Sequence, residues 1–260
     1  MKDLSPVCFL PVSLKENGHL FFGEGLREVE PDTRTLKDAR TVLEEPGGQG
    51  PDELYYMYRE VCREEDREAI RARGLRYDMT ILKPGKVGRE YIKTVGHYHP
   101  LKPGTTLTYP EVYEVIHGKA HYLFQKYGEG GAEEVILVEA HPGDKVLIPP
   151  NYGHITINPG DDFLVMSNWV ASGFSSIYEP LELLSGGAYI EIEEKDGSSQ
   201  FIPNPNYKDL PPLKREAIRE IRQLDLVKEI PMYQVFLKDP ENLIFLTDPE
   251  KYPELENLYR

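Results

Sequence analysis

The chain has 260 residues, a net charge of −14 and an apolar fraction of 40%. This length and apolar fraction suit one structural domain with its own core. The negative charge argues against a nucleic-acid backbone or an anionic membrane as a partner, whereas a small anionic substrate held by local donors stays compatible.

Residues 1–75 are predicted to form an N-terminal arm packed on the rest of the protein. The N-terminus lacks the basic start and apolar core of a signal peptide, and no run of about eighteen apolar residues follows, so we predict a cytoplasmic protein. Cys8 and Cys62 stand alone without a Cys-x-x-Cys motif, which argues against a disulfide framework or a thiolate zinc site. Within the arm, the aromatic segment Glu53–Arg63 indicates a strand.

Residues 76–203 have the pattern of an antiparallel β-barrel. Short apolar runs such as YDMTIL, EVYEVIHG and EEVILVEA alternate with turns rich in Gly, Pro, Asp and Asn. Short strands at regular spacing indicate an all-β barrel or sandwich, and the alternating strand–helix units of a parallel sheet are missing from the pattern.

Residues 204–260 are predicted to form a linker followed by a short helical C-terminal extension. The stretch PNPNYKDLPPL has linker composition. Leu213–Leu224 has apolar residues at helical spacing, which predicts an amphipathic helix. We expect the extension to belong to the same structural domain and to pack on the barrel or on a partner subunit, as a dimer clasp or as a lid.

Three imidazoles and one carboxylate carry most of the chemical meaning of this sequence. His97 and His99 are two apart, so on an extended strand both side chains lie on one face. Nitrogen and carboxylate donors together suit Fe, Mn, Ni, Cu or Zn, and four protein ligands leave two positions of an octahedral shell for water or substrate oxygens. The predicted metal ligands, here called the metal cluster, are His97, His99, Glu111 and His154.

The simpler interpretation of such residues is structural. A His-x-His pair alone is often two surface histidines, and an isolated glutamate is usually a solvated carboxylate. We therefore interpret the remaining four histidines as structural, namely His19, His117, His121 and His141.

Glycines and prolines frame the metal cluster in a pattern that resembles the cupin superfamily. Gly96 precedes the histidine pair, Gly118 follows Glu111 by seven residues, and Asn158 follows His154 by four. The resemblance covers about residues 94–158 and implies a double-stranded β-helix, or jelly-roll, barrel. One departure is the long segment PLKPGTTLTYP (residues 100–110), which we expect to form a loop at the barrel mouth.

A narrower resemblance extends over about residues 30–206. The segments MTILKPGKVGREY, TVGHYH and EVY, with RTLKDA and LYYMY upstream and PPNYGH downstream, look like cupin-type glucose-6-phosphate isomerase, the archaeal form of that enzyme. The resemblance implies a homodimeric enzyme of glycolysis and gluconeogenesis that interconverts glucose 6-phosphate and fructose 6-phosphate. It also implies one divalent transition metal per subunit, with Fe(II) favoured over Mn(II), Ni(II) or Zn(II).

The same resemblance implies roles for individual residues. Glu111 is the candidate catalytic group, as metal ligand or as the base that moves a proton through a cis-enediol; a metal-assisted hydride shift is the competing mechanism. The resemblance also implies two sets of substrate contacts. The phosphate would be bound by a phosphate cradle of Tyr55, Thr80, Thr94 and Gly96. The sugar would be contacted by Tyr113 and Tyr178.

The sequence departs from the family pattern after the barrel. Trp169 replaces the first Tyr of a family segment and Ser176 replaces its His, whereas Tyr178 matches. Three alternatives therefore stay open. The first is an isomerase or epimerase for another sugar phosphate, with Trp169 and the long loop reshaping the pocket. The second is a non-catalytic cupin that binds a metal or a sugar phosphate. The third is an iron dioxygenase, which the phosphate cradle argues against.

Overall fold

The computed structural model describes residues 1–128 and 131–259. Glu129 and Gly130, in a predicted barrel segment, and Arg260, at the end of the predicted extension, lie outside the described residues. The larger of two main sheets has six antiparallel strands in the order β12 (Lys145–Ile148), β9 (Glu111–His117), β14 (Leu164–Ala171), β6 (Leu75–Leu82), β5 (Glu53–Tyr58) and β4 (Asp32–Thr35). The other has the order β13 (Tyr152–Ile157), β10 (Ala120–Lys126), β11 (Glu134–Ala140) and β17 (Leu213–Glu216).

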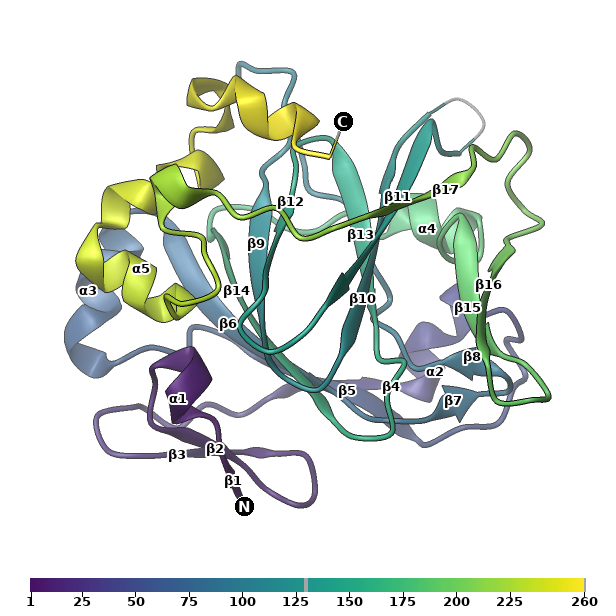
Figure 1. The fold of residues 1–260 in the computed structure, drawn as a ribbon, viewed down its shortest axis with the longest axis horizontal. Coiled ribbons are helices and arrows are strands. Elements are labelled where there is room, and N and C mark those ends of the chain that lie inside the picture. The colour runs from purple at the N-terminus through teal and green to yellow at the C-terminus, as the bar shows by residue number, and fades with distance from the viewer. Residues whose placement is uncertain (129–130, 260) are drawn as a thin grey trace.

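These two sheets face each other around a common core (Figure 1). Val115 and Met166 of the first sheet join Phe124 and Ile136 of the second in one buried apolar cluster. Alternate residues of each strand point inward, so the period-two pattern of the sequence fills the barrel interior. The predicted all-β barrel is confirmed.

The remaining elements are short. A three-stranded sheet contains β1 (Lys2–Asp3), β2 (Val12–Leu14) and β3 (Leu20–Phe22), and a four-stranded sheet contains β16 (Ser199–Pro203), β15 (Tyr189–Glu193), β8 (Glu90–Tyr91) and β7 (Lys86–Val87). The α-helices are α1 (Ser5–Cys8), α2 (Leu36–Ala39), α3 (Arg67–Ala72), α4 (Glu179–Leu183) and α5 (Met232–Lys238). The 3-10 helices are η1 (Arg40–Val42), η2 (Glu64–Asp66), η3 (Arg222–Leu224), η4 (Pro240–Leu246), η5 (Pro249–Lys251) and η6 (Pro253–Asn257). No helix of the described residues is long and apolar enough to cross a membrane.

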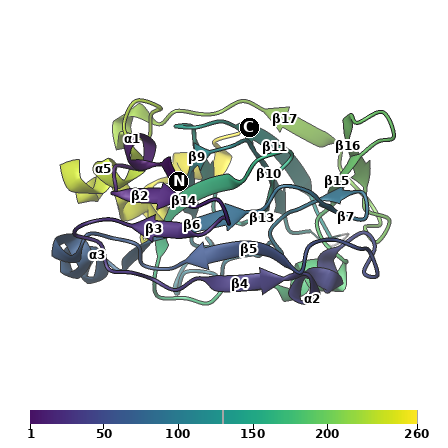
Figure 2. The same cartoon turned by 90° about the horizontal axis from the view of Figure 1, so that it is seen from below.

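The N-terminal arm contributes two strands to the larger sheet. Figure 2 shows β5 and β4 continuing this sheet beyond β6. The predicted strand Glu53–Arg63 is present as β5 but ends at Tyr58. Glu60 then takes a left-handed conformation with φ of 55° and donates its backbone N–H to the Asp78 carboxylate at 3.0 Å, which turns the chain out of the sheet.

The predicted helix Leu213–Leu224 is wrong. Leu213–Glu216 is strand β17, paired in parallel with β11, and only Arg222–Leu224 forms a turn of 3-10 helix. Pro211 and Pro212 favour extended backbone immediately before the segment, and the free edge of β11 offers backbone partners that a helix would forgo. The α-helix of the extension is α5 instead, which begins at Met232.

Trp169 attaches the extension to the barrel. Its indole stacks on the rings of Tyr233 and Phe236, with centroids 5.8 and 5.2 Å away, and donates a hydrogen bond to the backbone oxygen of Met232 at 3.0 Å. The indole therefore lies on the outer face of β14, beside α5. The suggestion that Trp169 reshapes the pocket is wrong, because neighbouring residues of a strand point to opposite faces and Asn168 takes the inner one.

We expect Trp169→Leu to lower the free energy of unfolding by about 2–4 kcal/mol, because it removes two aromatic contacts and the hydrogen bond from the indole to the Met232 oxygen. Chemical denaturation followed by circular dichroism measures this loss. The control Tyr127→Leu removes a ring that is 60% exposed, and we expect it to change stability by less than about 0.5 kcal/mol. Equal stability of the two variants would contradict the role given to Trp169.

Candidate metal centre and its pocket

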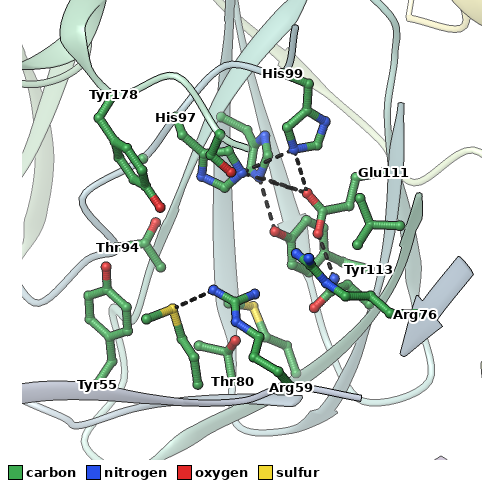
Figure 3. Close-up of a pocket in the computed structure, with 17 residues that line it drawn as sticks. Tyr55, Arg59, Arg76, Thr80, Thr94, His97, His99, Glu111, Tyr113 and Tyr178 are labelled. Carbon is green, nitrogen blue, oxygen red and sulfur yellow. Dashed lines mark hydrogen bonds and ion pairs between the residues drawn. The ribbon is translucent and has the colours of Figure 1, made fainter. Parts of the chain in front are cut away.

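The four side chains of the metal cluster converge inside the barrel (Figure 3). The Nε2 atoms of His97 and His99 are 3.1 Å apart, and the Nε2 atoms of His99 and His154 each lie 3.3 Å from Oε2 of Glu111. One ligand atom from each of His97, Glu111 and His154 falls within 4.8 Å of the others. His97, the most open of the set, still has a side chain only 21% exposed.

Local backbone pairing aligns these side chains. His97 and His154 face each other across an antiparallel bridge, with backbone N–H groups donated in both directions at 3.1 and 3.0 Å. Gly96, with φ of 77°, lets the two segments approach, because a Cβ there would lie 2.4 Å from Cγ1 of Ile155 and 3.0 Å from the His154 carbonyl oxygen. Tyr98, between the two histidines, points the other way, and its hydroxyl accepts a hydrogen bond from Gln125.

We expect Gly96→Ala to separate the His97 segment from the His154 strand. Metal affinity should fall at least about tenfold, and the free energy of unfolding should fall by about 1–3 kcal/mol. Gly104→Ala is a matched control, since Gly104 has a similar φ of 81° and a Cβ at that position would meet no atom within 4 Å. Metal titration and denaturation of both variants separate crowding from backbone strain. Equal metal affinity in the two variants would refute the close-approach argument.

Protonation states in the cluster favour a cation. Burial, together with repulsion from His154 and His99, holds the pKa of His97 well below its usual range, and burial also lowers the pKa of His154. Burial alone would raise the pKa of Glu111, but the adjacent imidazoles of His154 and His99 hold it well below its usual range. Near neutral pH His97 and His154 are therefore neutral and Glu111 is ionised, which are the metal-binding forms of these side chains.

Hydrogen bonds from neighbouring groups orient two side chains of the cluster, His99 and Glu111. Nδ1 of His99 lies 2.8 Å from the backbone oxygen of Tyr109, which assigns the proton to Nδ1 and leaves the Nε2 lone pair facing Glu111. Asn168 donates to Oε1 of Glu111 at 2.6 Å, whereas Oε2 is buried and makes no hydrogen bond. An unpaired carboxylate oxygen among imidazole nitrogens is costly unless a cation fills the space between them, so these residues fit a divalent metal.

Because the pKa values of His97 and His154 are lowered, acid competes weakly with the metal. We expect zinc affinity to fall less than about fivefold between pH 7.5 and 6.0, whereas three ordinary imidazoles would lose roughly fiftyfold. The unfolded chain binds more protons than the metal-free folded protein below pH ~6.5, so acidification also lowers the free energy of unfolding of that form. Competition with a chromophoric chelator at each pH measures the affinity, and a loss of tenfold or more would contradict the prediction.

The predicted substrate residues line the same pocket as the metal cluster. The hydroxyl of Tyr55 accepts a hydrogen bond from the backbone N–H of Val95 at 3.2 Å, and that of Thr94 accepts one from Thr156 at 3.0 Å. The hydroxyl of Tyr113 lies 3.0 Å from Nε2 of His154. The lining includes every residue implied by the resemblance, and Ser176 as well: Tyr55, Thr80, Thr94, Gly96, Tyr113, Ser176 and Tyr178.

Sequence reasoning missed two arginines and an asparagine of this pocket. Arg59, Arg76 and Asn168 all line it. Arg76 is four residues before Thr80 on β6, so strand alternation alone would have placed it on the Thr80 face. Arg59 is four residues after Tyr55 in the predicted strand Glu53–Arg63, so the same alternation would have placed it on the Tyr55 face.

The remaining histidines have other partners. His117 contacts Asp162 at 2.9 Å, His121 contacts Glu191 at 2.8 Å, and His141 contacts Glu139 at 3.1 Å. His19 lies 3.1 Å from the Tyr58 hydroxyl.

The long loop 100–110 lies beside the metal cluster and contacts the extension. Lys102 forms an ion pair with Glu250 at 2.7 Å and another with Asp248. The ring of Tyr109 stacks on Phe174 at 4.9 Å, and Phe174 in turn contacts the ring of His99 at 4.5 Å. The extension thus supports the loop that carries the backbone partner of His99.

The family model and the curated relatives agree on one family. The model of the glucose-6-phosphate isomerase family matches residues 33–208. Glucose-6-phosphate isomerase from Thermococcus kodakarensis is 36% identical over 160 residues, which cover 60% of this chain and 74% of that protein. The enzyme from Pyrococcus furiosus is 34% identical over 159 residues, covering 60% and 73%. A structure of oxalate decarboxylase from Bacillus subtilis has a TM-score of 0.35 at 18% identity over 48% of this chain and 27% of that one, a similarity too low to support an argument.

Proposed function

The chain belongs to the glucose-6-phosphate isomerase family, and on this premise we propose that it interconverts glucose 6-phosphate and fructose 6-phosphate at the metal-cluster pocket. The observation that carries the proposal is the convergence of His97, His99, Glu111 and His154 in one cavity that also exposes hydroxyls of Tyr and Thr. This reaction moves hydrogen between C1 and C2 of the open-chain sugar, so the site must hold two neighbouring oxygens and stabilise developing negative charge.

The metal cluster would hold one divalent transition metal per subunit, with Fe(II) favoured and Mn(II), Ni(II) or Zn(II) as alternatives. When bound, such an ion supplies positive charge against the oxygens on C1 and C2. The protein's part is to keep His97 and His154 neutral by burial and to orient Glu111 through Asn168.

Glu111 is the proposed catalytic group. Its Oε2 points into the cluster without a hydrogen-bond partner, and its lowered pKa keeps the carboxylate ionised and able to accept a proton. In the enediol mechanism Glu111 takes the proton from C2 or C1 and returns it to the other carbon. In a hydride shift it would serve as ligand only, and both mechanisms stay open.

The phosphate is assigned to the hydroxyls of Tyr55, Thr80 and Thr94 and the backbone N–H of Gly96. Tyr113 and Tyr178 are assigned to the sugar. In support, Figure 3 shows Tyr55, Thr94 and Tyr178 directed into one side of the pocket. We also propose a cytoplasmic homodimer acting in glycolysis and gluconeogenesis.

A second candidate is isomerisation or epimerisation of a different sugar phosphate. Ser176 lines the pocket where the family pattern has His, so a group for ring opening or for one sugar hydroxyl is replaced by a shorter side chain. A non-catalytic sugar-phosphate-binding cupin is the alternative from another class.

The deciding test is a coupled assay with purified protein, added Fe(II), Mn(II), Ni(II) or Zn(II), and fructose 6-phosphate, read by the appearance of glucose 6-phosphate. We expect turnover with at least one metal and none after chelation. Absence of turnover with every metal would sink the isomerase proposal. Binding of the sugar phosphate without turnover would favour the non-catalytic alternative.

A further inference from the structure

Two arginines in the pocket share one buried carboxylate. Nη1 of Arg59 and Nε of Arg76 each donate to Oδ2 of Asp78 at 2.8 Å, and Asp78 is fully buried. The other oxygen of Asp78 accepts the backbone N–H of Glu60. A buried carboxylate that holds two guanidinium groups fixes their positions. Nε of Arg59 also lies 3.8 Å from Asp32, but that carboxylate is 71% exposed, so the buried part of the site has two cations against one anion.

The outer nitrogens of this arginine pair remain available to a ligand. Among the described residues, the hydrogen bond of Arg76 is made by its Nε, and Nη2 of Arg59 contacts only the sulfur of Met57 at 3.2 Å. The side chains of Arg59 and Arg76 are 38% and 25% exposed, and both line the metal-cluster pocket. Their free N–H groups therefore face the cavity that the substrate enters.

Strand register places Arg76 at the metal end of the pocket, and the shared Asp78 carboxylate holds Arg59 beside it. Across the neighbouring strands β6, β14 and β9, Arg76 lies opposite Val170, and Val170 lies opposite Glu111. Two residues further along β6, Asp78 is aligned in the same way with Asn168 and Tyr113. Thr80 lies four residues further along β6, about 13 Å from Arg76 at the usual rise of a strand. Figure 3 shows Arg76 beyond Glu111 and Tyr113, across the pocket from Tyr55, with Arg59 between them.

We propose that Arg59 and Arg76 form a second anion-binding subsite, so that the pocket prefers phosphorylated sugars carrying a second anionic group at the C1 end. The ligand class comprises sugar bisphosphates and phosphorylated sugar acids, which share this second anion. The inference rests on the proposed function and deepens it, because the first phosphate is assigned to the hydroxyls around Tyr55, Thr80 and Thr94. A monophosphate leaves the outer N–H groups of the arginine pair without a ligand, whereas a two-anion ligand can contact both the hydroxyls and the arginines.

Isothermal calorimetry on zinc-loaded protein tests the subsite without requiring turnover. The probes are fructose 6-phosphate, fructose 1,6-bisphosphate and 6-phosphogluconate at one ionic strength. We expect the two-anion probes to bind at least about tenfold more tightly than fructose 6-phosphate, the usual gain from a charge-assisted contact. Which of the two binds more tightly distinguishes a second phosphate from a carboxylate.

The variants Arg59→Gln and Arg76→Gln separate this subsite from a single phosphate anchor. Each leaves one guanidinium on Asp78, so the buried carboxylate keeps a partner. We expect either variant to bring the affinity ratio close to one while fructose 6-phosphate binding changes by less than about twofold. Arg222→Gln is the matched control, since Arg222 is 75% exposed and pairs with Glu220, and it should leave all three affinities unchanged.

Two outcomes would overturn the proposal. One is equal affinity of the unaltered protein for one-anion and two-anion probes. The other is an equal loss of all three affinities in Arg59→Gln and Arg76→Gln, which would make the pair the anchor for a single phosphate. If the protein shows the expected affinity ratio but no isomerase turnover, the proposed function is wrong and the second anion-binding subsite is supported.

Discussion

His99→Ala is expected to abolish both metal retention and turnover. The variant removes the imidazole whose orientation is fixed by the Tyr109 backbone oxygen, and it leaves the carboxylate of Glu111 buried with one contact fewer. We expect metal content after dialysis to fall below about a tenth of a metal per subunit, and turnover to fall by more than about 10³-fold, since the group that stabilises the developing charge is lost. Elemental analysis and the coupled assay measure the two quantities.

The control for this variant is His141→Ala. The imidazole of His141 is 53% exposed and contacts Glu139 outside the barrel, so its loss should change neither metal content nor turnover. Retained activity in His99→Ala would show that the metal argument is wrong. Retained metal with lost activity would instead give His99 a role in the reaction beyond metal binding.

Glu111→Gln should separate the two roles proposed for this side chain. The amide keeps the shape and one potential oxygen ligand but cannot accept a proton, so metal still binds at saturating concentration. We expect turnover under those conditions to fall by about 10²–10⁴-fold, the range for loss of a general base. A loss smaller than about threefold at saturating metal would assign Glu111 to metal binding alone and favour the hydride shift.

The same variant needs a test of folding, because Asn168 donates to Glu111. In the metal-free variant the single amide oxygen of glutamine can face Asn168 and accept this hydrogen bond, so the free energy of unfolding of that form should stay within about 1 kcal/mol. A larger loss would mean that the drop in activity includes a structural part. Comparing zinc-loaded and metal-free protein then separates metal-linked stability from packing.

The tertiary structure decided several features against the local sequence pattern. Leu213–Glu216 has a helix-compatible pattern, yet it pairs with the open edge of β11. Trp169 occupies a family position in the sequence, but its indole packs against α5 because the extension covers that face. Arg59 and Arg76 form a pair because the chain after β5 lies beside β6, where both side chains bind the carboxylate of Asp78.

The sequence by itself determined the barrel, the family and the metal cluster, because these depend on short-range rules. Residues two apart on a strand share a face, and a glycine before the pair permits one close approach. It could not determine which free strand edge a distant segment joins, nor which charges meet inside the pocket. Those outcomes depend on contacts between residues far apart in the chain, where burial and partner availability outweigh local propensity.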